Sequence, residues 1–293
     1  MIVSVRGTQP AVRIWWAVVL NLFLSGTEVS SAEKVTGILL VKDVLTGTNQ
    51  SVAIEAKLIR KGLLGDAGLG GEPLELVRNG QVVGKAMTGG DGRAVFQFTP
   101  NMRGLATLTV RVGDSPRVGT AESTTNVAAW ERRKPILAVE VAALMEEPVP
   151  SSPVPSLVLG EKGNRAPMPD AAGELNKLTQ FYYNLIYVAT AENDRSDGFA
   201  TNELIRAWLK AHKFPPGHIL VLPAGTDAVG TKLDELHAAG WKTLKVGVGR
   251  SKTFAEAFLQ RRLEAVVVPE PAKGEVPRKA KVAKDWRDVR KKL

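Results

Sequence analysis

The sequence predicts two domains of different fold class: an all-β sandwich, followed by an α/β domain built as three layers around a parallel sheet. Residues 34–129 consist of short segments of alternating polarity separated by turn residues, which is typical of antiparallel strands. Residues 134–271 alternate continuous apolar runs with segments of helical periodicity, which is typical of a parallel sheet covered by helices. The 293 residues, 44% hydrophobic and 24% charged, are sufficient for two domains of modest size.

The first domain is predicted from its turn signals. Asn79-Gly80 separates two short apolar segments, and an Asn-Gly pair is the strongest local signal for a hairpin. Residues 88–93 are rich in Gly and Asp, which tolerate the positive φ angles of tight turns. The segments predicted as strands are 52–58, 74–77, 81–83, 94–98 and 105–112. Turns at this spacing indicate an antiparallel sandwich.

The stretch 71–94 resembles the immunoglobulin-like repeats of bacterial surface proteins. The resemblance lies in Glu72-Pro73-Leu74 and in the turn 88–93, which are loose motifs that describe turns. It implies an immunoglobulin-like sandwich that serves as a spacer or an adhesion module.

The second domain begins with residues 136–141, a continuous apolar run as expected for a strand buried on both faces. Residues 148–155 are rich in Pro and Ser and are predicted to form a loop. Helices are predicted near 169–180, 201–212, 230–239 and 253–262, and further strands at 185–189, 218–222, 243–248 and 265–268. In such sheets ligands bind at the carboxyl ends of the strands.

Several segments of the second domain, taken in order, resemble one phosphatase family. They are residues 183–190, 201–209, 214–220 and 247–258, followed by Lys273-Gly274-Glu275. Together they are similar to the lipin and phosphatidylinositol-transfer-protein branch of the haloacid dehalogenase (HAD) superfamily. The resemblance implies a HAD-like α/β fold. Lipins of this branch dephosphorylate phosphatidic acid with magnesium, whereas other members bind lipid without turnover.

The resemblance also indicates which catalytic groups are lost. In a HAD phosphatase one Asp attacks phosphorus and the Asp two residues later acts as general acid and base, which contributes about 10²–10⁴-fold. The matching residues are Glu140, a degenerate nucleophile, and Ala142, a lost acid/base position. Phe254 stands where the magnesium-binding Asp is expected. The sequence therefore favours a protein without enzymatic activity, with no metal site and no cofactor; magnesium is expected only if the domain is active.

Residues that the resemblance implies for phosphate binding are retained. They are Thr190, Lys232, Gly249, Arg250 and Ser251. The loop containing the last three can present backbone N–H groups and a guanidinium to an anion. A purely structural interpretation stays open, with a threonine at a strand end, a solvated lysine and glycines required for packing.

The N-terminus carries the features of an export signal. Arg6 and Arg13 precede the apolar run 14–24, and the segment 29–32 offers small residues at the two positions that a signal peptidase reads, with cleavage after Ala32. Residues 1–32 are therefore predicted to be a cleaved signal peptide, and the protein is expected to be periplasmic or secreted. The alternative, an uncleaved anchor, is disfavoured because the run is shorter than the ~20 residues that span a bilayer. The sequence contains no cysteine, which excludes disulfides and thiolate metal sites.

Residues 272–293 are predicted to form a basic amphipathic tail. From Lys273 onward nine Lys or Arg residues face three acidic ones. Four apolar residues recur at helical spacing: Val282, Trp286, Val289 and Leu293. Such a helix can lie on an anionic membrane surface or dock against its own domain; a frayed terminus is the alternative, because short isolated helices are marginal in water. No nucleic-acid-binding motif accompanies the tail, so no nucleic-acid partner is predicted.

The hypothesis from sequence is an exported pseudoenzyme. Its HAD-like, phosphatidate-phosphatase-like domain would bind a phosphate-bearing small molecule, a phospholipid or a protein partner. The first alternative is an active phosphohydrolase that uses Glu140 as its nucleophile. The second alternative is a structural or adhesion protein with no small ligand.

Overall fold

The computed structural model describes residues 34–63, 65–147, 165–191, 197–225, 227–271 and 276–293. Residues Val35–Leu293 belong to one unit of the fold. The predicted signal peptide lies outside the described residues. No helix within the described ranges combines the length and the apolar character needed to cross a membrane.

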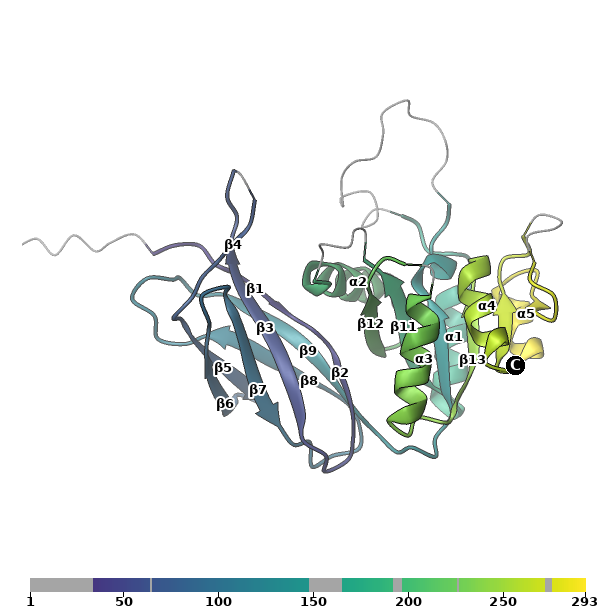
Figure 1. Cartoon of the computed structure of the whole chain (residues 1–293), viewed down its shortest axis with the longest axis horizontal. Helices are drawn as coiled ribbons and strands as arrows, with labels where there is room; N and C mark the ends of the chain where they lie inside the picture. The colour runs from purple at the N-terminus through teal and green to yellow at the C-terminus, as the bar shows by residue number, and fades with distance from the viewer. Residues whose placement is uncertain (1–33, 64, 148–164, 192–196, 226, 272–275) are drawn as a thin grey trace, which may run out of the picture. The chain divides into compact units, whose positions relative to one another are not determined.

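The first half of the described chain forms two β-sheets with a shared core (Figure 1). One sheet contains β1 (Ile38–Val41), β3 (Val52–Arg60), β4 (Ala67–Gly68) and β7 (Arg93–Phe98). The other contains β2 (Val44–Gly47), β5 (Pro73–Arg78), β6 (Gln81–Met87), β8 (Gly104–Val112) and β9 (Glu122–Trp130). Inward-facing side chains such as Leu58, Phe96 and Leu108 are buried between the sheets.

The sheets are antiparallel except at one edge, where β2 runs parallel to β9. The expectation of a wholly antiparallel sandwich is therefore wrong at this edge. Only Lys42 and Asp43 separate β1 from β2, and the chain passes from one sheet to the other at this point.

The hairpin predicted at Asn79-Gly80 is present. Strands β5 and β6 pair in antiparallel register, with Arg78 opposite Gln81. Asn79 has φ of 50° and Gly80 has φ of 79°. Two successive positive φ angles are what a two-residue type I′ turn requires, and this explains the choice of an Asn-Gly pair.

The second half contains a parallel sheet, as the sequence predicts, with six strands where the sequence predicts five. Its order is β12-β11-β10-β13-β14-β15, and every pair is parallel. The strands are β10 (Ile136–Glu140), β11 (Asn184–Thr190), β12 (His218–Leu222), β13 (Leu244–Gly249), β14 (Glu264–Val267) and β15 (Lys281–Val282). Because β10 lies between β11 and β13, the carboxyl ends of these three strands are neighbours.

Helices cover both faces of this sheet and make three layers. Helices α1 (Ala171–Phe181), α2 (Phe199–Ala211) and α5 (Trp286–Lys292) share one core with a short 3₁₀ helix, η1 (Val141–Leu144). Helices α3 (Ala228–Ala238) and α4 (Lys252–Gln260) contribute to the core on the other face. Along β10 the side chains alternate, so that Leu137 and Val139 enter the first core and Ile136 and Ala138 enter the second.

The segment predicted as a basic tail is docked in the described structure. Strand β15 pairs with β14, and α5 packs beside α1. Trp286 and Val289 are fully buried, and Trp286 Nε1 donates to the carbonyl oxygen of Ala143 at 3.1 Å. The sheet thus continues beyond residue 271. Of the alternatives left open by the sequence, the structure therefore has the one in which the apolar face of this segment docks against its own domain.

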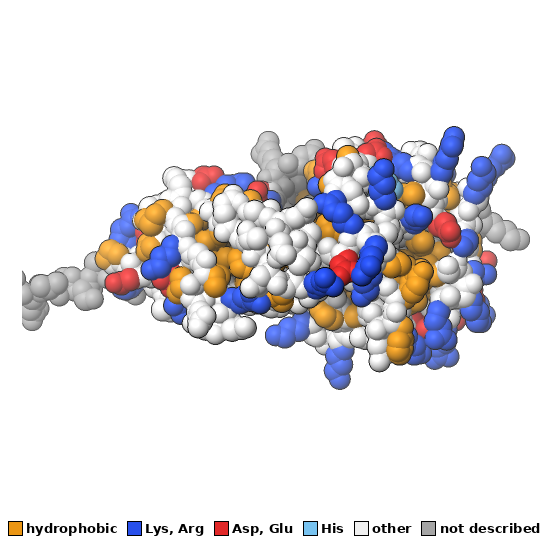
Figure 2. Space-filling view, turned by 90° about the horizontal axis from the view of Figure 1, so that it is seen from below, with side chains coloured by type: hydrophobic (Ala, Val, Ile, Leu, Met, Phe, Trp, Pro, Cys, Tyr) orange, Lys and Arg blue, Asp and Glu red, His pale blue; other side chains and the backbone are white. Residues whose placement is uncertain are grey.

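Positive charge is spread more widely than the C-terminal segment. Lys and Arg side chains predominate among the charged groups on the face shown in Figure 2, in keeping with a net charge of +9. Lys242, Lys245 and Arg262, which precede or begin strands of the parallel sheet, line a shallow depression beside Glu264.

Helix α2 is tied to the first half of the chain by a buried ion pair. Arg206 Nη2 donates to Asp43 Oδ1 at 2.6 Å, and the Asp43 side chain has no exposed surface. The backbone N–H of Ile219, on β12, donates to Asp43 Oδ2 at 3.1 Å. One acidic side chain therefore fixes both a helix and a strand of the parallel-sheet half.

Candidate functional site

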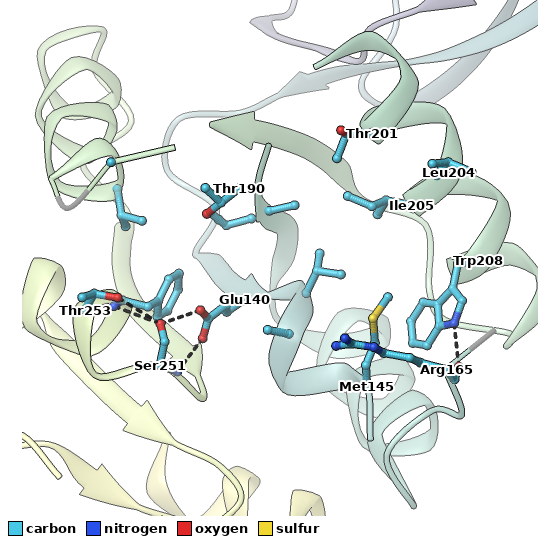
Figure 3. Close-up of a pocket in the computed structure, with 17 residues that line it drawn as sticks. Glu140, Met145, Arg165, Thr190, Thr201, Leu204, Ile205, Trp208, Ser251 and Thr253 are labelled. Atoms are coloured by element: carbon cyan, nitrogen blue, oxygen red, sulfur yellow. Dashed lines mark hydrogen bonds between the residues drawn. The ribbon is translucent and has the colours of Figure 1, made fainter. Parts of the chain in front are cut away.

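A cavity of about 230 Å³ lies at the carboxyl ends of β10 and β11 (Figure 3). Glu140 and Ala142 line it from the end of β10, and Thr190 lines it from the end of β11. Ser251 enters from the loop that follows β13. This is the position that the parallel-sheet topology predicts for a ligand site.

The Glu140 carboxylate is bound by the loop between β13 and α4. Its Oε2 atom accepts hydrogen bonds from the backbone N–H groups of Arg250, at 2.6 Å, and Ser251, at 2.9 Å. Its Oε1 atom accepts one from the Ser251 hydroxyl at 2.5 Å. Figure 3 shows the carboxylate turned toward this loop. Both carboxylate oxygens are therefore engaged within the protein.

The loop favours a carboxylate at this position because it precedes a helix. Ser251 is the N-cap of α4, and its hydroxyl accepts a hydrogen bond from the backbone N–H of Phe254 at 3.2 Å. The unpaired N–H groups and the dipole at a helix N-terminus attract an anion. Gly249 permits the approach, because a Cβ atom there would lie 2.8 Å from Glu140 Oε2. Glu140 thus acts as an internal anion for the loop.

The neighbouring residues supply neither an acid nor metal ligands. Ala142 lines the cavity without a proton to donate, and the Phe254 ring is buried. Magnesium prefers near-octahedral coordination by oxygen atoms. Glu140 is committed to the loop and the two other positions offer no side-chain oxygen, so the residues present do not fit this ion. Within the described ranges, no cluster of three or more His, Cys, Asp or Glu residues is placed to hold a metal.

The structure brings together only part of the predicted phosphate-binding set. Thr190 and Ser251 line the cavity, whereas the side chains of Lys232 and Arg250 do not. Lys232 Nζ lies 2.8 Å from Glu235 Oε2, one turn further along α3. Arg250 Nη2 donates to the carbonyl oxygen of Met145 at 2.8 Å. The two predicted cations are therefore engaged elsewhere.

Arg165 is a charged residue of the cavity that the sequence did not reveal. It lines the cavity together with Trp208, and its carbonyl oxygen accepts a hydrogen bond from Trp208 Nε1 at 2.9 Å. An isolated antiparallel β-bridge between Met145 and Pro167 places the segment that contains Arg165 beside η1. Arg165 follows a Pro/Ser-rich stretch without periodicity, and tertiary contacts with Trp208 and η1 place it at the site.

The remaining walls of the cavity are mainly apolar. They include Val141 and Met145, and on α2 Leu204, Ile205 and Trp208. Hydroxyl groups are contributed by Thr190, Thr201 and Thr253. Glu140 and Arg165 are its charged residues within the part of the chain that the structure describes. The arrangement suits a ligand that has both an apolar body and a charged group.

Comparison with known proteins gives no family model and no curated protein that matches the chain. Among solved structures, it is similar to D,D-heptose 1,7-bisphosphate phosphatase from B. bronchiseptica complexed with magnesium and phosphate. The identity is 15%, the match covers 55% of this chain and 97% of that chain, and the TM-score is 0.41. For the same enzyme from Burkholderia thailandensis these values are 13%, 53%, 96% and 0.37. For domain I10 of titin they are 11%, 32%, 97% and 0.23. At identities of 15% or lower, no activity is transferred from these proteins to the chain.

Proposed function

We propose that the parallel-sheet half is a HAD-like scaffold of the phosphatidate-phosphatase type that binds an anionic, phosphate-bearing ligand without hydrolysing it. The sandwich half is proposed to be an immunoglobulin-like spacer in a protein exported by residues 1–32. Support comes from the sheet order, which makes neighbours of Glu140, Thr190 and the loop 249–251. These are the positions that the lipin-like resemblance selects.

The observation that carries the proposal is the engagement of Glu140. To attack phosphorus, its carboxylate would have to give up hydrogen bonds from Arg250 and from Ser251. Hydrogen bonds to charged groups contribute about 1.5–3 kcal/mol each, and about 1.4 kcal/mol corresponds to a tenfold change in rate. The missing acid at Ala142 removes a further factor of about 10²–10⁴. Binding without turnover is the function most consistent with this geometry.

The proposal predicts no Glu140-dependent phosphatase activity. The purified protein is assayed with phosphatidic acid and with an aryl phosphate, with and without magnesium, beside the variants Glu140→Gln and Glu256→Gln. Glu256 is the matched control, because it is an α4 carboxylate paired with Lys252 and is not one of the residues that line the cavity. We expect the three proteins to be indistinguishable from the assay background. Magnesium-dependent turnover that disappears only in Glu140→Gln would establish the active-phosphohydrolase alternative instead.

A further inference from the structure

We propose that Arg165 anchors the acidic head group of a small amphiphilic anion whose apolar body lies against η1 and α2. The inference rests on ligand binding in the proposed function, but it does not depend on the absence of turnover. It transfers the anion-binding role from Lys232 and Arg250, which the sequence indicated, to a residue on another segment of the chain. The relevant chemistry is a single carboxylate or phosphate group attached to one short chain or ring.

The Arg165 guanidinium is not fully hydrogen-bonded within the described part of the chain. It points into the cavity beside Trp208 (Figure 3), and its Nε atom is buried without a hydrogen-bond partner within the described part of the chain. The Nε atoms of Arg206 and Arg250 are also unpaired, but the terminal nitrogens of these residues are bound to Asp43 and to the carbonyl oxygen of Met145. A buried donor without an acceptor is destabilising, because it has lost its hydrogen bond to water. An anion that enters the cavity would satisfy it.

The charge balance of the cavity favours the entry of an anion. Glu140 is the acidic residue that lines it, and both of its carboxylate oxygens already accept hydrogen bonds from the loop 250–251. Arg165 therefore lacks an internal counter-ion among the described lining residues. The planar fork of a guanidinium matches the two oxygens of a carboxylate or of a phosphate group. One cation is suited to one acidic group.

The walls of the cavity suit an apolar ligand body. The cavity that Arg165 lines has mainly apolar walls, which include Met145, Leu204, Ile205 and the ring of Trp208. Burial of apolar surface stabilises a complex in proportion to the area removed from water, so inorganic phosphate would use only part of the site. The volume of about 230 Å³ lies below the ~300–1,000 Å³ of pockets that enclose larger ligands. It suits one short chain or one ring rather than the two acyl chains of a phospholipid.

The proposal is tested by isothermal titration calorimetry of the full chain with n-octyl phosphate, octanoate, inorganic phosphate and octanol. We expect at least one of the two amphiphilic anions to bind about tenfold more tightly than inorganic phosphate and octanol, a difference of about 1.4 kcal/mol. Binding of octyl phosphate alone assigns the head group as phosphate, and binding of octanoate alone assigns it as carboxylate. Absence of binding by both anions would overturn the proposal.

Three variants examine the role of Arg165. Arg165→Met is expected to weaken binding of the amphiphilic anion at least tenfold while leaving octanol binding unchanged, and Arg165→Lys is expected to recover part of the loss. Lys232→Met is the matched control and should bind as the wild type does, because Lys232 does not line this cavity. Thermal unfolding of each variant verifies that it is folded. Unaltered anion binding in Arg165→Met, or a loss confined to Lys232→Met, would refute the assignment.

The two proposals fail in distinguishable ways. Hydrolysis of octyl phosphate that requires Glu140 would overturn the proposal that the domain does not hydrolyse its ligand. Weaker octanoate binding by Arg165→Met would in that case still support Arg165 as the anchor of the anionic group. Anion binding without turnover that Arg165→Met leaves unaltered would overturn the anchor alone, whereas absence of anion binding would overturn both the anchor and the ligand binding of the proposed function. It would also favour the structural or adhesion alternative, in which no small ligand binds.

Discussion

Replacing Asp43 by alanine is expected to lower the free energy of unfolding by about 3–5 kcal/mol, the usual effect of breaking a buried ion pair. The substitution leaves the Arg206 side chain, which is 12% exposed, without its buried counter-ion. It also leaves the backbone N–H groups of Asn126 and Ile219 without the acceptor that they share. Urea unfolding of the two proteins at neutral pH measures the difference.

Two further variants isolate the cause of this loss. Asp114→Ala removes an exposed carboxylate from the same half of the chain, and we expect it to alter the free energy of unfolding by less than about 0.5 kcal/mol. The double variant Asp43→Leu/Arg206→Met should lose less than Asp43→Ala, because no unpaired charge stays buried. If Asp43→Ala were as stable as Asp114→Ala, the pair would not secure α2.

Stability is expected to decrease by about 3 kcal/mol between neutral pH and pH 4 because of His218. Burial lowers the pKa of His218 from 6.5 to about 4; the charge of Lys232 acts in the same direction, and that of Asp43 opposes it. The unfolded chain therefore takes up a proton near pH 6.5, while the folded protein does not until about pH 4. This contribution is fully present above pH 6.5 and is lost progressively as the pH falls toward 4.

The measurement is the free energy of unfolding of the wild type and of His218→Leu at several pH values from 7.5 to 4. Carboxylates that titrate near pH 4 affect both proteins, so the prediction concerns the difference between the two curves. We expect the wild type to lose about 3 kcal/mol more than the variant over this range. Parallel curves would mean that His218 is protonated as readily in the folded protein as in the unfolded chain.

Elements with local signals could be predicted from the sequence. The hairpin at Asn79-Gly80 and the parallel strands of the second half have such signals, since turn chemistry and continuous apolar runs are properties of neighbouring residues. Strand β9 was not predicted because its last four residues, 127–130, are all buried and show no alternation. The docking of α5 depends on the packing of Trp286 against core residues that are distant in the sequence.

The candidate site was predictable in its position and not in its details. Glu140 and Ser251 come together because they follow or end the neighbouring strands β10 and β13. The order of the motifs along the chain is sufficient to predict this proximity. The side chain of Lys232 is directed by its ion pair with Glu235, and that of Arg250 by its hydrogen bond to the carbonyl oxygen of Met145. No sequence motif predicts these two interactions. The segment of Arg165 is held beside the cavity by an isolated β-bridge between Pro167 and Met145. The residues next to Arg165 in the sequence therefore give no indication of its role.

The most direct test of the proposed function is the mass of the intact protein after brief mixing with an aryl phosphate and magnesium, followed by an acid quench. A HAD-type nucleophile would carry a phosphoryl group at this point, whereas a Glu140 carboxylate held by Arg250 and Ser251 is predicted to stay unmodified. We expect a single species with the mass of the free protein. A magnesium-dependent phosphoryl adduct that maps to Glu140 would contradict the account.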